Sequence, residues 1–102
     1  MERQLSRNTV ALLNALKQVN VGDYIIRANA ALAEGKLDEA AAAVAALANA
    51  NRGIYDARRQ EAFKTAKNYF RYGRTVEEAT KRVIYSNAVW DYLKPFFDVA
   101  SN

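Results

Sequence analysis

The positions of four glycines constrain the fold of this chain more than any other feature. Glycine occupies positions 22, 35, 53 and 73, and each lies where a helical pattern of apolar residues ends or begins. Glycine is favoured at helix ends because it adopts left-handed backbone dihedral angles without a steric penalty. No segment alternates apolar and polar residues as a strand would. The sequence therefore predicts an all-α fold of five to six short helices packed as antiparallel hairpins.

Capping residues and apolar spacing give the expected bounds of these helices. They are residues 9–19 with Ser6 or Asn8 as the cap, Asp23 as a cap to Gly35, Asp38 through the alanine run to 49, and 54–72. A short helix capped by Thr75 follows, then a tight turn around Tyr85 and Ser86, and Ser86 caps a last helix to Pro95. Pro95 should end or kink the last helix because it has no amide hydrogen to donate. The expected core consists of Leu12, Leu16, Ile25, Leu32, Val44, Leu47, Ala62, Ala66, Val83 and Leu93.

The length of 102 residues predicts a single helical domain, spanning residues 1–102. Residues 1–52 would form alanine-rich helical hairpins, and residues 54–97 a basic helix followed by a helix-turn-helix-like unit. The segment AALAEGKLDEAAAAV also resembles one hairpin of a tetratricopeptide repeat, and GRTVEEA echoes it 38 residues later. The repeat of that family is 34 residues long, so we interpret this similarity as hairpin chemistry that the two segments share.

The composition argues against an enzyme, a cofactor or a bound metal. The chain contains no cysteine and no histidine, which excludes disulfides, zinc sites of the Cys/His type and the serine triad. It has neither a GxxxxGK[ST] loop nor a GxGxxG turn. The adjacent carboxylates Glu77 and Glu78 would point in different directions on a helix. With no apolar run of membrane-spanning length either, we expect a non-catalytic protein of the reducing cytoplasm that does not contact a membrane.

Positive charge is concentrated in the second half of the chain. Residues 1–50 carry five basic and five acidic side chains, whereas residues 51–102 carry ten and six. Such an excess would attract a polyanion, although a solvated helix face explains it equally well. Helical spacing places Lys64, Lys67, Arg71 and Arg74 on one face, opposite the expected core stripe. We expect these four residues, together with Lys81 and Arg82, to contact nucleic-acid phosphates.

The segment from residue 73 to residue 95 carries the most specific signal. Thr75 and Glu78 form a capping box, and Ser86 is a second cap. The run TVEEATKRVIYSNAVWDYLK resembles the helix-turn-helix of small bacterial and phage DNA-binding proteins, including small terminase subunits. The resemblance covers about a fifth of the chain, with Ile84 standing where the turn usually has glycine.

This resemblance implies a DNA-binding regulator or accessory factor of bacterial or phage origin. Its second helix would direct Asn87, Asp91 and Lys94 toward the bases. A homodimer would place two such helices in successive grooves. Tyr69, Tyr72 and Tyr85 lie among the basic residues and could stack on bases. The interface of the dimer would consist of Trp90, Tyr92, Phe96 and Phe97.

The alternative is a small helical protein-interaction module with no role in nucleic-acid binding. An adaptor or a phage-encoded inhibitor would use the aromatic carboxyl-terminal segment or the alanine-rich hairpin against a protein partner. The two hypotheses differ in one measurable property, because only contacts with phosphates release condensed counterions and so depend steeply on salt.

Overall fold

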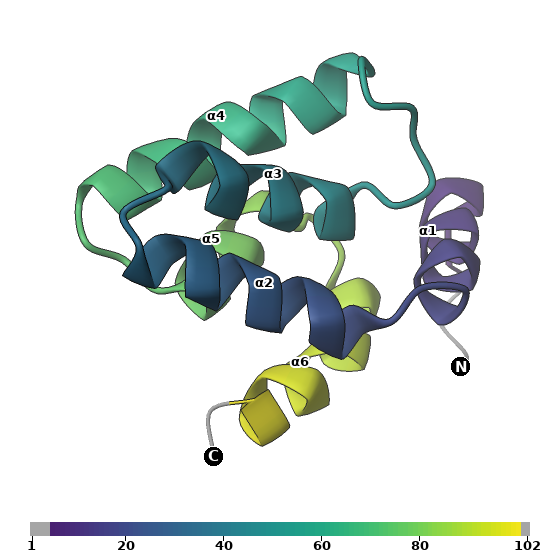
Figure 1. The fold of residues 1–102 in the computed structure, drawn as a ribbon. Helices are drawn as coiled ribbons and strands as arrows, with labels where there is room; N and C mark the ends of the chain where they lie inside the picture. The colour runs from purple at the N-terminus through teal and green to yellow at the C-terminus, as the bar shows by residue number, and fades with distance from the viewer. Residues whose placement is uncertain (1–4, 101–102) are drawn as a thin grey trace.

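The computed structural model describes residues 5–100 and contains, within that range, only helices and the loops between them (Figure 1). The expected all-α fold is confirmed, with six helices. They are α1 (Arg7–Lys17), α2 (Val21–Ala33), α3 (Leu37–Ala48), α4 (Ala57–Arg71), α5 (Val76–Val83) and α6 (Asn87–Ala100). No helix in the described part of the chain is long and apolar enough to cross a membrane.

The helix α3 lies at the centre of the arrangement, between α2 and α4 (Figure 1). The helix α5 packs mainly against α4 and α3, whereas α6 packs against α2 and α1. The radius of gyration of the Cα atoms is 13.0 Å, the value expected for a compact chain of about 100 residues. Every helix contributes at least one side chain to a shared apolar core.

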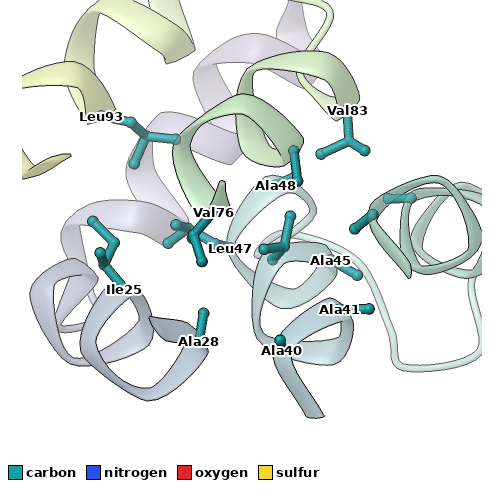
Figure 2. Packing of buried hydrophobic residues seen from close by; sticks show 14 of the residues in the cluster. Ile25, Ala28, Ala40, Ala41, Ala45, Leu47, Ala48, Val76, Val83 and Leu93 are labelled. Atoms are coloured by element: carbon teal, nitrogen blue, oxygen red, sulfur yellow. The ribbon is translucent and has the colours of Figure 1, made fainter. Parts of the chain in front are cut away.

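Alanine makes up a large part of this core. Nine of the 20 buried apolar residues are alanines, and four of those nine, Ala40, Ala41, Ala45 and Ala48, come from α3 (Figure 2). Small side chains allow α2 and α4 to approach α3 closely, which is why the central helix is the alanine-rich one. The buried hydroxyl of Thr80 is also satisfied, since Oγ1 donates to the carbonyl oxygen of Val76 at 2.8 Å.

The predicted core agrees closely with the observed one. Eight of the ten expected residues are buried, and the other two, Leu12 and Leu32, are partly buried and pack against the core. Both exceptions lie on helices at the outside of the arrangement, where one flank of the apolar stripe faces solvent. Apolar spacing therefore identified the inward faces of the helices, although it could not show how far each face is covered.

Gly35 and Gly73 end α2 and α4 in the same way. Both have φ of +76°, in the left-handed region. After Gly35 the Lys36 amide donates to the Ala31 carbonyl at 2.9 Å, and after Gly73 the Arg74 amide donates to the Tyr69 carbonyl at 3.1 Å. These are the hydrogen bonds of a Schellman motif. The similarity between the two segments is therefore a repeated helix ending, as the hairpin interpretation expected.

Several predicted helix bounds are wrong. The cap of α2 is Asn20, whose side chain accepts from the Asp23 amide at 3.3 Å, so Asp23 and Gly22 lie inside the helix. The helix α4 begins at residue 57 rather than 54, because Asp56 caps it. Short polar side chains are good caps at any of several neighbouring positions, so the sequence did not distinguish between them.

Pro95 does not end the last helix, which continues to Ala100. Proline removes one backbone hydrogen bond, to the carbonyl of Asp91 four residues earlier. Asp91 and Pro95 are both exposed, so that carbonyl lies on the side of the helix that faces water. Leu93 and Phe97, on either side of the proline, are buried in the core and hold both halves of α6 in place.

Replacing Gly35 or Gly73 with alanine should lower the free energy of unfolding by about 1–2 kcal/mol, because an L-residue at positive φ is strained. Gly53 provides a matched control: its φ lies outside the positive range and an added Cβ would meet nothing within 4 Å. Gly53→Ala should change stability by less than about 0.5 kcal/mol. Urea unfolding of the three variants measures these values, and equal costs at all three positions would contradict this account of the helix ends.

Candidate nucleic-acid interface

The cations of α4 do not form the uniform exposed row that helical spacing suggested. Lys64 and Arg71 are exposed and form no ion pair with the other described residues. Lys67, between them, is half-buried, and its Nζ lies 2.6 Å from Oδ1 of Asp38 on α3. The reason is geometric: Lys67 lies on the flank of α4 next to the amino-terminal end of α3. A cross-helix ion pair of this kind depends on tertiary packing and leaves no spacing signal.

Arg74 lies in the loop that follows α4. Its Nη1 is 3.4 Å from Oε2 of Glu78, so the guanidinium pairs with the first turn of α5. Glu78 completes the predicted capping box, since its Oε1 accepts from the Thr75 amide at 3.1 Å while Thr75 Oγ1 accepts from the Glu78 amide. The hydrogen bond from the Thr75 amide is the main cause of a lowered pKa of the Glu78 carboxyl, and Arg74 adds to it.

The two cations near the end of α5 lie in different surroundings. Lys81 Nζ is 5.9 Å from the centre of the Trp90 ring on α6, within cation–π range. Arg82 is exposed and forms no ion pair with the other described residues. Of the six expected phosphate contacts, three are therefore available without breaking an existing interaction. We call this set, Lys64, Arg71 and Arg82, the cationic face.

The residues expected to face bases are only partly presented to solvent. Asn87 and Asp91 are exposed at the start of α6. Lys94 is half-buried and donates to Asp98 Oδ1 on the next turn of its own helix, and this hydrogen bond is the largest cause of the raised pKa of Lys94. An aspartate next to the bases would repel phosphate, so α6 is a poorer candidate for contact with nucleic acid than α4 and α5.

The two helices of the segment from residue 73 to residue 95 pack against different neighbours. The helix α5 lies against α4 and α3, while α6 lies against α2 and α1. Residues 84–86 join them without helical structure, with Ile84 at φ −94° and ψ 127°. The extended link follows from the β-branched isoleucine at the position where a helix-turn-helix usually has glycine.

The aromatic residues expected at a dimer interface are divided between core and surface. Phe97 is only 2% exposed and packs against Trp90 in a tilted arrangement, with ring centres 5.6 Å apart, so it belongs to the core. Trp90, Tyr92 and Phe96 are half-buried, and the rings of Tyr92 and Phe96 lie 5.5 Å apart. An interface through α6 could therefore use only these three of the four predicted residues.

The structure also contains a cleft that sequence reasoning missed. It has a volume of about 620 Å³ and lies between α1, the α3–α4 loop, α4 and the link from α5 to α6. Its lining comes from four segments that are distant in the sequence, so neither spacing nor a motif could have identified it. The exposed tyrosine at position 85 and the asparagine-rich stretch 49–51 were the only visible signals.

Comparisons with protein-family models, curated proteins and solved structures give no match to this chain. No activity or partner can therefore be transferred from a relative. The features that bear on function are therefore the cationic face, the half-buried aromatic residues Trp90, Tyr92 and Phe96, and the cleft.

Proposed function

We propose that this protein binds nucleic acid, most favourably DNA, without catalysing a reaction, and that it does so in the cytoplasm. The observation that carries the proposal is the cationic face: three exposed cations on two helices that pack against each other, with no ion pair to the other described residues. Such side chains can exchange their counterions for phosphates without first losing a protein contact.

Neighbouring groups on α4 would complement the charges. Asn68 lies one turn after Lys64 and is exposed, and Tyr72, at the carboxyl end of the same helix, is 77% exposed. Amide and phenol groups are common donors to phosphate oxygens, and such contacts position a protein on a nucleic acid without reading its sequence. The arrangement therefore supports binding with little sequence preference.

The salt dependence of binding to a short DNA duplex tests the proposal. Three phosphate contacts predict a slope of log K against log salt of about −2.7, or roughly 40-fold weaker binding at 200 mM than at 50 mM salt. If Lys67, Arg74 and Lys81 leave their present partners and also bind phosphates, the slope should approach about −5. Fluorescence anisotropy across a salt series measures this slope. Absence of binding at 50 mM salt would reject the proposal.

A protein-interaction module remains the second candidate because of a different surface. Ile26 on α2 is 61% exposed and Val99 on α6 is 77% exposed, and these two helices pack against each other. Apolar side chains on adjacent helices are suited to a protein partner. This candidate predicts self-association or partner binding that persists at high salt, in contrast to binding through the cationic face.

A further inference from the structure

The cleft beside α4 has the size of a ligand site. Its volume of about 620 Å³ lies within the range of roughly 300–1,000 Å³ that is typical of small-molecule sites. Three apolar residues of its lining, Leu12, Ala62 and Val89, are buried or partly buried, whereas most of the exposed lining residues are polar. An amphipathic ligand with a flat apolar body would match this arrangement better than a free ion would.

The polar groups of the cleft include three side-chain amides that form no hydrogen bond with the other described residues. Asn8, Asn49 and Asn51 all line the cleft, and none of their side chains forms a hydrogen bond in the described structure. An amide presents a donor and an acceptor side by side, which is also the pattern on the edge of a nucleobase. By contrast, the hydroxyl groups of Ser6 and Ser86 accept from the amides of Thr9 and Val89 as helix caps.

The charged groups of the cleft favour a ligand with one anionic end. Arg58 lines the cleft, is exposed and forms no ion pair with the other described residues. Arg52 also lines it, although its Nη1 pairs with Asp56 Oδ2 at 3.4 Å. Among the described residues Glu61 is the one carboxylate of the lining, so an anionic group would lie toward Arg58, and the carboxylate could accept from an exocyclic amino group.

The lining also includes one exposed aromatic side chain that could cover a flat ligand. Tyr85 lines the cleft and is 83% exposed, on the link between α5 and α6. An exposed ring of this kind has little to pack against within the chain, and base–aromatic stacking is the usual way in which proteins hold unpaired bases. Amides, an arginine and an exposed ring therefore converge on one cleft.

We propose that this cleft binds a single unpaired nucleotide, with Tyr85 stacked on the base, the asparagine amides on its edge and Arg58 on its phosphate. The same chemistry fits a free mononucleotide or an unstacked nucleotide of a strand. The proposal that the nucleotide belongs to a strand rests on the proposed function. The cationic face lies on α4, which also lines the cleft, and on α5, which leads into the link that carries Tyr85.

Tyr85→Ala and Arg58→Gln test the cleft, and Tyr55→Ala and Arg27→Gln are their matched controls. All four side chains are exposed, and neither control residue lines the cleft. The probes are free nucleoside monophosphates, a short single-stranded DNA and a duplex. Tyr85→Ala should weaken binding of monophosphates and of the single strand by about 5- to 100-fold. Arg58→Gln should also weaken it, whereas the two controls should leave monophosphate binding unchanged.

The outcomes separate this inference from the proposed function. If the wild-type protein binds neither monophosphates nor the single strand, or if Tyr85→Ala and Arg58→Gln bind them as well as wild type does, the cleft inference is rejected even when salt-dependent duplex binding remains. If monophosphates bind through the cleft while neither DNA probe binds, the nucleotide site is supported with a free nucleotide as its source, and the proposed function fails.

Discussion

Leu93→Ala should lower the free energy of unfolding by about 2–5 kcal/mol, the usual cost of a cavity left by a buried leucine. Leu93 has no exposed surface and lies on α6, which packs against α2 and α1. A domain of this size has a total stability of roughly 5–15 kcal/mol. Each kcal/mol lost lowers the Tm by roughly 4–8 °C, so a thermal melt followed by circular dichroism and a urea titration would both detect the change.

Val99→Ala is the control for this prediction because it removes apolar atoms from the same helix at a position that is 77% exposed. It should change stability by less than about 0.5 kcal/mol. The comparison of Leu93→Ala with Val99→Ala also tests how α6 is held in place around Pro95, since the buried residues Leu93 and Phe97 lie on either side of the proline. A cost below about 1 kcal/mol for Leu93→Ala would show that α6 does not pack in the observed position.

The sequence was sufficient for the features that depend on local chemistry. The positive φ at Gly35 and Gly73, the capping box of Thr75 and Glu78, and the inward positions of most core residues follow from spacing within one helix or one turn. These features are set by interactions between residues three to five apart, which a single sequence displays directly.

The features that the sequence did not predict depend on which helices become neighbours. Pro95 is tolerated because flanking core contacts outweigh one lost hydrogen bond, and these contacts come from α1 and α2, far away in the chain. The prediction that Lys67 belongs to an exposed basic row was wrong for the same reason. Asp38 lies beside Lys67 only because α3 packs against α4. Helical periodicity gives the face of a helix on which a residue lies, but not the partner of that face.

The cationic face and the cleft also differ in how far the sequence could predict them. Charge and spacing placed Lys64, Arg71 and Arg82 among six candidate cations, but only the fold separates them from Lys67, Arg74 and Lys81, which already have partners. The cleft could not be selected, because its amides, arginines and Tyr85 come from separate segments that only the fold brings together. We therefore expect the cationic face to account for most of the affinity and the cleft for any preference among nucleotides.

Replacing the whole cationic face should remove most of the salt-dependent binding. In the variant Lys64→Gln, Arg71→Gln, Arg82→Gln, three phosphate contacts are lost, so the slope of log K against log salt should become less steep by about 2.7. Thermal stability should barely change, because all three side chains are exposed and form no ion pair with the other described residues. Anisotropy with the DNA duplex at several salt concentrations gives the slope for both proteins.

The control for net charge is the variant Arg7→Gln, Lys17→Gln, Arg27→Gln, whose three cations are also exposed but lie on α1 and α2. Both triple variants lower the formal net charge from +4 to +1. If attraction depended on net charge alone, the two would lose affinity equally, whereas a defined binding face predicts a large loss only for the α4–α5 variant. Equal losses would therefore reject the cationic face as a site, and unchanged slopes in both variants would direct the search for a partner to the exposed apolar residues Ile26 on α2 and Val99 on α6.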